Sequence, residues 1–368
     1  MDQTGITPLP ANPEPHRPAA FRRDARSHRA LSTAKALWWT TNRAAGRAIA
    51  KPADDETAPP PGVDTPPPRA GRLRSAWLEA FEKDAADVAA GLYPVTETPP
   101  RNVAQPIRRA VDVIADARQV EARRKRGGAV EAREEEGSIG PTYYRQNFHY
   151  QTGGWFTADS AKRYEAQVEA LFSGAAGAMR RRALSLLAKA WRDQDQRDLK
   201  IADIACGSGA FLKDLKGAFP RAAVAGVDLS HAYAQEAGLR SGAGMAQAAA
   251  ERLPFADVSL DGVSCIYLFH ELPPKVRPAV AAELARVLKP GGVLAFADSI
   301  QTVDAPDLDR LLQAFPAFFH EPYFASYQAT DLSALFAGAG LLPEARDSAF
   351  LTKALLFRKP AATGIADA

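Results

Sequence analysis

Residues 199–211 contain the feature that most restricts the fold of this chain, a buried-strand pattern that runs directly into a glycine-containing turn and then into a helix pattern. A mostly apolar run ends at Ile204, small side chains follow as far as Gly209, and the helical pattern begins at Ala210. Without a Cβ at Gly207 or Gly209, a ligand can approach the backbone, and the first amides of the helix point at it. The alternative interpretation is a glycine-containing turn of the kind found in any α/β protein.

A second short strand pattern, residues 224–228, ends in a carboxylate. This residue, Asp228, lies 19 positions after Gly209 (228 − 209). An acid at the tip of the second strand can accept hydrogen bonds from both hydroxyls of a ribose held over the glycine turn. The alternative for Asp228 is a helix N-cap, with Leu229 and Ser230 following it. The spacing and the strand context favour the ribose.

Strand and helix patterns alternate after the turn. Further strand patterns cover residues 244–249, 262–269 and 293–300, and repeated strand–helix units predict a parallel, doubly wound sheet with its ligand outside the carboxyl ends of the strands. Residues 341–348 and 351–358 are separated by so few residues that they predict an antiparallel hairpin. We therefore expect an α/β fold with a mainly parallel seven-stranded sheet and a C-terminal antiparallel hairpin, preceded by a helical, partly disordered N-terminal region.

Changes in composition divide the chain into three parts. Residues 1–140 are helical and rich in proline and charge, and the proline runs 59–61 and 66–68 indicate a stiff linker. Residues 141–198 are expected to form a helical cap or lid, and residues 199–360 form the alternating domain. The charged run after residue 120 is expected to be exposed or disordered.

Charge and cysteine content exclude several function classes. A net charge of +3 over 368 residues gives no reason to expect a nucleic-acid partner. Cys206 and Cys265 make no metal-ligand spacing and are typical of small, reduced core residues of a cytoplasmic protein, so no metal site is expected. The start of the chain lacks the features of a signal peptide, and no segment approaches the roughly 18 consecutive apolar residues of a membrane helix. The oligomeric state is left open.

Residues 28–50 carry apolar side chains at near-helical spacing, with several basic residues and no acid. A helix packed on the main domain explains this pattern, and a peripheral amphipathic helix on a membrane surface is the alternative.

Two aromatic segments are candidates for the walls of a second pocket. Residues 143–156 combine rings with a flexible Gly153-Gly154 pair, which suits a loop that folds over a ligand or an aromatic anchor to the core. Residues 315–327 hold more rings than a solvent-facing connection ordinarily carries. Together with His270 they predict a pocket for a small apolar or aromatic molecule, and the alternative is that the rings only seal the core.

Four motifs occur in order along the alternating domain: Asp-Ile-Ala-Cys-Gly-Ser-Gly (203–209), Gly-Val-Asp-Leu-Ser (226–230), Ala-Glu-Arg-Leu-Pro-Phe (250–255) and Leu-Ala-Arg-Val-Leu-Lys-Pro-Gly-Gly (284–292). This set resembles class I S-adenosylmethionine-dependent methyltransferases. Within them it is most similar to the small-molecule branch that includes the ubiquinone and menaquinone C-methyltransferases. The resemblance covers roughly residues 200–300 and implies S-adenosyl-L-methionine as the cofactor of the 199–360 domain.

The resemblance also implies where each part of the cofactor lies. The methionine part would lie against the glycine turn and Asp203, the ribose on Asp228, and the adenine between Leu229 and residues 249–251. The Asp that many relatives use for the adenine amino group aligns with Ala249, which leaves backbone groups or Glu251 to make that contact. The cofactor-binding residues expected in this way are Asp203, Ala205, Cys206, Gly207, Ser208, Gly209, Asp228, Leu229, Ala249, Ala250, Glu251 and Tyr267.

A methyltransferase has to align the acceptor with the methyl group but does not have to activate the methyl group. A sulfonium methyl carbon is already electrophilic, so the enzyme aligns the acceptor, excludes water and supplies a base where the acceptor carries a proton. The expected catalytic residues are His270, Glu271, His320 and Tyr323. For either histidine, a purely structural role is the alternative. The expected reaction is C- or O-methylation of a small acceptor.

Two other classes of protein remain as alternatives. A nicotinamide-dependent dehydrogenase also uses a glycine turn and an acid about twenty residues on, but its G-x-G-x-x-G pattern has a third glycine where this chain has Leu212. A non-catalytic protein could use the same fold to bind a ligand.

Overall fold

The structure is a computed structural model and describes residues 19–50, 65–95, 104–134 and 140–361. The helices are α1 (Ala19–Ala50), α2 (Arg72–Ala89), α3 (Ala104–Arg126), α4 (Ala158–Leu171), α5 (Ala176–Ala190), α6 (Ala210–Ala218), α7 (His231–Ser241), α8 (Arg277–Val287), α9 (Asp309–Phe318), α10 (Phe324–Gln328) and α11 (Leu332–Gly338). The strands are β1 (Lys200–Ile204), β2 (Ala223–Asp228), β3 (Gly244–Gln247), β4 (Leu260–Ile266), β5 (Leu288–Ser299), β6 (Leu342–Ala349) and β7 (Thr352–Arg358). Short 3-10 turns are η1 (Glu131–Glu134), η2 (Phe148–Tyr150), η3 (Gln196–Asp198), η4 (Phe269–Glu271) and η5 (Pro306–Leu308).

The seven strands form one sheet in the order β3-β2-β1-β4-β5-β7-β6. Strands β1 to β5 pair in parallel, whereas β7 runs antiparallel to both β5 and β6. The predicted fold class is therefore confirmed. One strand end differs: β5 begins at Leu288 and not at residue 293, because Leu288 already pairs with Leu260 ahead of an irregularity in the ladder.

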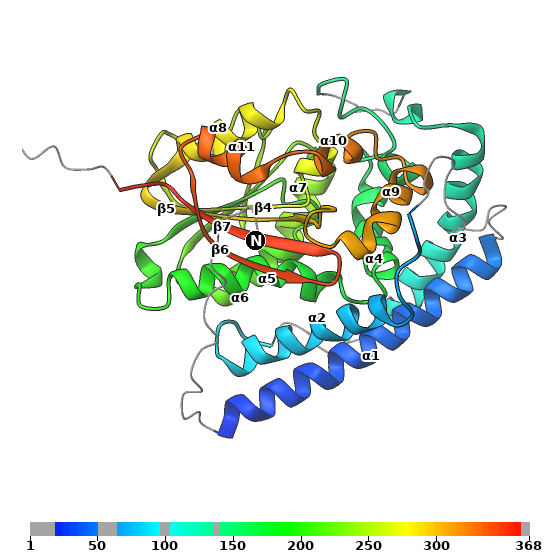
Figure 1. Cartoon of the computed structure of the whole chain (residues 1–368), viewed down its shortest axis with the longest axis horizontal. Helices are drawn as coiled ribbons and strands as arrows, with labels where there is room; N and C mark the ends of the chain where they lie inside the picture. Colours follow the sequence, from blue (N-terminus) through cyan, green and yellow to red (C-terminus); the bar gives the residue numbers. More distant parts are fainter. Residues whose placement is uncertain (1–18, 51–64, 96–103, 135–139, 362–368) are drawn as a thin grey trace, which may run out of the picture.

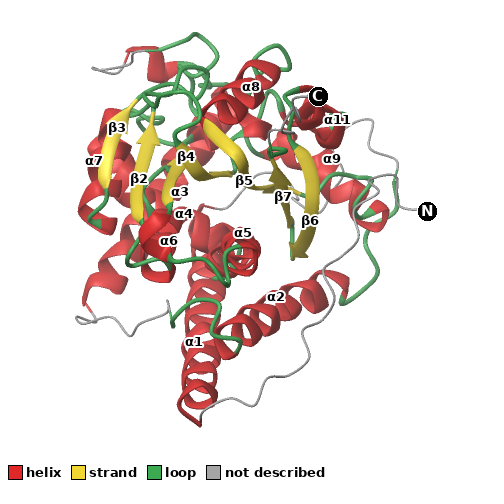
Figure 2. Ribbon diagram, turned by 90° about the vertical axis from the view of Figure 1, so that its left-hand side faces the viewer, coloured by secondary structure: helices red, strands yellow, loops and turns green. Residues whose placement is uncertain are grey.

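Helices cover both faces of the sheet (Figure 2). Apolar side chains of α8 and α11 pack on one face, around Phe336 and Leu284, and those of α5 and α6 pack on the other, around Leu187 and Leu212. Adjacent residues of β1, such as Ile201 and Ala202, belong to the two different cores. Burial on both faces explains why the central strands read as continuous apolar runs.

Helices α1 and α2 lie beyond α5, on the outer side of that layer (Figure 1). Asp84 of α2 is fully buried. Arg181 of α5 donates to both of its carboxylate oxygens, at 2.8 Å to Oδ1 and at 2.6 Å to Oδ2. Tyr93 donates to Oδ1 at 2.8 Å, and the His28 ring of α1 lies 2.6 Å from Oδ2. Burial alone would raise the pKa of Asp84, but Arg181 and His28 hold it well below its ordinary value. A buried ion-pair network thus connects these helices to α5, and the predicted division at residue 140 stays a prediction.

The charged run after residue 120 is ordered where the structure describes it. Residues 121–126 complete α3, and Arg123 is buried because its guanidinium donates to the Glu131 carboxylate at 2.8 Å and to the Tyr150 carbonyl at 2.6 Å. The expectation of exposure was wrong for this arginine, and residues 135–139 lie outside the described part of the chain. The proline run 59–61 lies outside it as well.

Helix α1 packs against α2, α3 and α4 and buries Trp39, as the packed-helix interpretation expects. Leu37 remains 69% exposed on its outer side. Among the described residues, none of the helices combines the length and the apolar character that crossing a membrane requires. Peripheral membrane contact through α1 stays a prediction.

Candidate functional site

A cavity lies at the edge of the sheet where strands β1, β2 and β4 end. Its walls are Tyr143, Tyr144, Phe148, Trp155, Tyr164, Ala205, Gly207, Asp228, Leu229, Tyr233, Ala248, Ala250, Glu251, Ile266, Tyr267, Leu268, Glu271 and Leu272. The sequence-predicted site residues among them are Ala205, Gly207, Asp228, Leu229, Ala250, Glu251, Tyr267 and Glu271. This is the edge at which a doubly wound sheet is expected to bind its ligand.

The backbone at the tips of the two central strands adopts unusual conformations. Ala205 after β1 and Tyr267 after β4 both have positive φ angles, 54° and 58°, although neither is glycine. Such conformations cost free energy and cluster at functional sites. Gly207 has a φ of 55°, and a Cβ there would meet only the Tyr164 ring at 3.8 Å, so the turn is open toward the cavity.

Gly209 also has a packing role, and its expected part in cofactor binding stays a prediction. It precedes α6 with a φ of 77°, and a Cβ there would stand 2.6 Å from the Cα of Ala237. The missing side chain at Gly209 therefore lets α7 pack against the turn, because that space is filled by the helix.

Asp228 ends β2 and is buried at 8% exposure. One carboxylate oxygen accepts from the backbone N–H of Gly207 and the other from that of Ser230, each at 2.8 Å. Ser230 itself caps α7, since its hydroxyl accepts from the Tyr233 N–H, so the N-cap interpretation of Asp228 does not hold. Burial raises the pKa of Asp228 to about 6, an effect that the two N–H donors partly offset.

Three buried polar atoms around the turn have no hydrogen-bond partner in the described structure: Asp203 Oδ2, Ser208 Oγ and Trp155 Nε1. Asp203 receives a hydrogen bond from Ser264 on its other oxygen at 2.6 Å, and burial raises its pKa to about 7. A carboxylate oxygen, a hydroxyl and an indole N–H can serve the ammonium and the carboxylate of an amino acid. Trp155, which lines the cavity, and Asp203 and Ser208, close in sequence to the lining residues, thus offer groups that suit the methionine end of S-adenosylmethionine.

Aromatic rings from two helices and one loop segment form the opposite wall. Trp155 lies edge-on to Tyr164 of α4 and Tyr233 of α7, with ring centroids 5.2 and 5.4 Å apart. Tyr143 donates a hydrogen bond to Glu251, and Gln151 donates to Tyr233 at 2.8 Å. The segment 143–156 thus lines the cavity, as a loop over a ligand would, and it is also anchored to α7. Both interpretations of its aromatic content therefore describe part of its structure.

Of the four predicted catalytic residues, Glu271 alone lines the cavity. His270 faces Asp298, with Nδ1 2.6 Å from Oδ1. Burial alone would lower the pKa of His270, but the Asp298 carboxylate raises it to about 10. His320 lies 2.7 Å from the Gln146 side chain, and Tyr323 packs beside the aromatic wall without lining the cavity.

Several expected residues do not line the cavity, and several unexpected ones do. The expected residues outside the lining are Asp203, Cys206, Ser208, Gly209, Ala249, His270, His320 and Tyr323. Sequence analysis did not find Tyr164 or Tyr233. The position of Tyr233 in the first turn of α7, shortly after Asp228, is a signal that could have found it, whereas no local pattern marks Tyr164.

Part of the chain is similar to known methyltransferases. Residues 201–292 match a family model described as a methyltransferase domain. The chain is 32% identical over 148 residues to the O-methyltransferase cnsE of Penicillium expansum, a match that covers 38% of this chain and 51% of that protein. The chain thus spans about half the length of this curated relative.

Solved structures also match. An S-adenosylmethionine-dependent methyltransferase from Aquifex aeolicus is 16% identical with a TM-score of 0.40, covering 55% of this chain and 99% of that one. The magnesium protoporphyrin IX methyltransferase ChlM from Synechocystis, solved with bound SAH, is 18% identical with a TM-score of 0.38, covering 50% and 84%.

Residues 201–292 are therefore similar to a methyltransferase domain, and they form most of the parallel part of the Rossmann-like sheet. These matches agree with the expected enzyme class and with S-adenosylmethionine as its cofactor. The finer assignment to the ubiquinone and menaquinone branch is not confirmed.

Proposed function

We propose that the protein transfers the methyl group of S-adenosylmethionine to a hydroxyl oxygen of a small apolar or aromatic acceptor. The observation that carries this proposal is a cavity whose lining combines two kinds of residue. The glycine turn and Asp228 contribute to it, together with seven aromatic side chains and Glu271. The similarity of part of the chain to an O-methyltransferase supports oxygen as the target atom. The resemblance of the four motifs to C-methyltransferases makes carbon the alternative.

In this proposal each part of the cofactor has its own partners. When bound, S-adenosylmethionine supplies an electrophilic methyl carbon on a positively charged sulfur. Asp228 accepts hydrogen bonds from the ribose hydroxyls while its N–H partners keep it oriented. Asp203 attracts the ammonium group, and Ser208 and Trp155 donate to the methionine carboxylate. Cys206, Gly209 and Ala249 shape the backbone around these groups, and Ala205, Leu229 and Ala250 contact the cofactor directly.

The aromatic wall performs the remaining task, which is to hold the acceptor in line with the methyl group and to exclude water. Glu271 accepts a hydrogen bond from the acceptor hydroxyl, and Tyr267 separates it from the glycine turn. His270 is a positioning residue, because its contact with Asp298 fixes the turn that carries Glu271. We assign a similar positioning role, behind the wall, to His320 and Tyr323.

The test is calorimetric titration with S-adenosylmethionine, followed by transfer of a labelled methyl group to a panel of phenols, aliphatic alcohols and quinols. We expect binding with one cofactor per chain and a product that carries a new methoxy group by NMR. A carbon-bound methyl would select the alternative target atom. A chain that binds the cofactor and produces no S-adenosylhomocysteine with any acceptor would support the non-catalytic interpretation.

The nicotinamide-dependent dehydrogenase is not favoured. Leu212 stands in place of the third glycine and is fully buried, with its side chain close to Gly226 of β2. Saturable binding of NAD or NADP in the same calorimetric experiment, with no binding of S-adenosylmethionine, would reverse this conclusion.

A further inference from the structure

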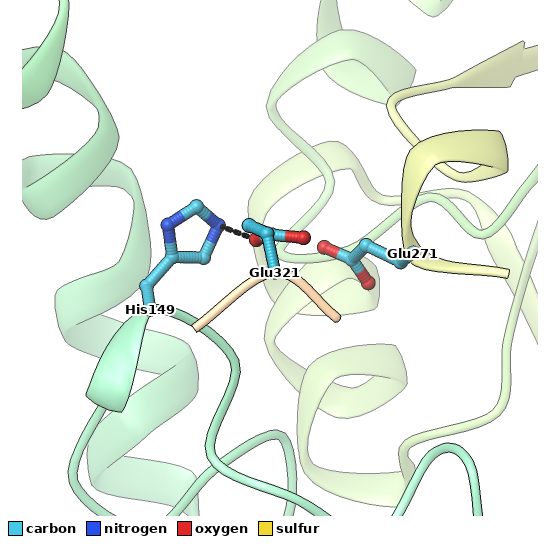
Figure 3. Close-up of side chains that lie close together, drawn as sticks. All are labelled: His149, Glu271 and Glu321. Carbon is cyan, nitrogen blue, oxygen red and sulfur yellow. Dashed lines mark ion pairs between the residues drawn. The ribbon is translucent and has the colours of Figure 1, made fainter. Parts of the chain in front are cut away.

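Three segments that are distant in sequence bring His149, Glu271 and Glu321 together beside the cavity (Figure 3). His149 belongs to η2, Glu271 ends η4, and Glu321 lies between α9 and α10. One ligand atom from each side chain lies within 4.8 Å of the others. His149 Nε2 and Glu321 Oε1 are 2.8 Å apart.

Glu321 is the unusual member of this cluster. It is 2% exposed, and neither of its carboxylate oxygens accepts a hydrogen bond in the described structure. In Figure 3 one oxygen faces the His149 ring and the other faces the Glu271 carboxylate. A buried carboxylate without hydrogen bonds is costly unless a cation compensates it, and a second carboxylate facing it adds repulsion. A positive charge between these two side chains would relieve both costs.

Apart from His149, which lies 2.8 Å from Glu321 and belongs to the cluster, the nearby basic side chains have other partners. His270 Nδ1 faces Asp298 at 2.6 Å, and its other nitrogen is 4.0 Å from Glu271. Arg277 donates to the Phe269 and Tyr323 carbonyls and to two hydroxyls. Neither of these groups enters the space between Glu271 and Glu321.

We propose that His149, Glu321 and Glu271 bind one divalent transition-metal cation, of the Mn²⁺ or Zn²⁺ type, and that this cation binds an oxygen atom of the acceptor. One imidazole with two carboxylates suits these ions, whereas Mg²⁺ and Ca²⁺ prefer oxygen ligands alone. Ligand atoms about 2.1 Å from an ion lie about 3 to 3.5 Å from one another. Side-chain rotations that move the ligand atoms by about 1 Å therefore bring all three within bonding distance of one ion.

Three protein ligands leave coordination positions for water or substrate. Glu271 also lines the cavity, so a cation held there is within reach of an acceptor in the cavity. The acceptor class is therefore a hydroxylated compound whose oxygen acts as a metal ligand. This inference rests on the proposed function for the identity of the acceptor, and the metal site itself does not depend on it.

The experiment titrates Mn²⁺ into the chelator-treated full chain without S-adenosylmethionine and follows free Mn²⁺ by electron paramagnetic resonance. We expect one saturable site per chain, displaced by Zn²⁺. Glu321→Gln and Glu271→Gln should each weaken Mn²⁺ binding at least tenfold. Glu251→Gln, an acid of the same cavity that is bound by Tyr143, is the matched control and should bind Mn²⁺ like the wild type.

Two results would overturn the inference: no saturable Mn²⁺ or Zn²⁺ binding by the wild type, or wild-type affinity in a folded Glu321→Gln variant. If Glu321→Gln fails to fold, by circular dichroism, Glu271→Gln decides in its place. S-adenosylmethionine binding is measured separately on the same samples. A chain that binds the cofactor but no metal leaves the proposed function standing, and a chain that binds metal but no cofactor overturns the proposed function alone.

Discussion

Replacing Asp228 by Asn tests the ribose assignment with the smallest change in shape. The carboxylate holds two backbone N–H groups, those of Gly207 and Ser230, one on each oxygen. Alanine would leave both donors unsatisfied and would disturb the glycine turn itself, so it cannot separate binding from folding. Asparagine keeps one acceptor oxygen and loses the charge. One of the two buried N–H groups then faces an NH₂ group.

The expected magnitudes follow from these contacts. One unsatisfied buried N–H costs about 1 to 3 kcal/mol of folding stability. A hydrogen bond from a ribose hydroxyl to a charged acceptor contributes about 1.5 to 3 kcal/mol, so the loss of one should weaken S-adenosylmethionine binding roughly 10- to 140-fold. The affinity is measured by calorimetry near pH 7.5, and the stability by urea unfolding.

Asp261→Asn is the matched control. Asp261 lies at the other end of β4, where it accepts from the Lys200 N–H at 2.9 Å and pairs with Lys289 at 2.7 Å. This variant should lose stability but bind the cofactor like the wild type. If a folded Asp228→Asn variant binds S-adenosylmethionine within twofold of wild type, Asp228 only supports the turn, and the reasoning from strand-tip spacing fails.

Burial raises the pKa of Asp228 to about 6. Since the ionised form is the better acceptor, the affinity for the cofactor should be full well above pH 6 and fall roughly tenfold by pH 5. Calorimetry across pH 5 to 8 checks this, and a flat profile would contradict it. Asp84→Asn should cost about 3 to 5 kcal/mol of unfolding free energy, because it removes the carboxylate charge that lies 2.6 Å from the buried Arg181 guanidinium. The exposed Glu79→Gln should change it by less than about 0.5 kcal/mol, and equal urea midpoints would show that the buried network contributes nothing. Gly209→Ala should be about 1 to 3 kcal/mol more destabilising than Gly291→Ala. Both glycines have positive φ, but only at Gly209 would a Cβ collide with a helix. Similar melting temperatures of the two variants would mean that α7 shifts without cost.

Local sequence signals were sufficient to predict the sheet and to place the glycine turn next to Asp228. The strand–turn–helix pattern around Gly207 and the acid at Asp228 predicted neighbouring strand tips, because consecutive parallel strands joined by a right-handed crossover bring their carboxyl ends to one edge. The hairpin at the end of the chain was predicted for a similar reason, since two strands joined by so short a connection can only pair with each other in antiparallel fashion. These features depend on residues close in sequence or on a general rule of chain handedness.

Only the tertiary structure decided which side chains complete the site. Tyr164 lines the cavity because α4 turns that face inward, and a helix pattern does not specify which neighbour its face meets. His320 was expected near the chemistry, yet its ring lies against Gln146, while the adjacent Glu321 meets His149 and Glu271. These contacts join residues that are far apart along the chain, and their free energy comes from packing and desolvation that exist only once the elements have assembled. Local periodicity carries no information about such contacts, and this is why Tyr164 and the cluster around Glu321 could not be predicted from the sequence, whereas the rings of residues 143–156 could.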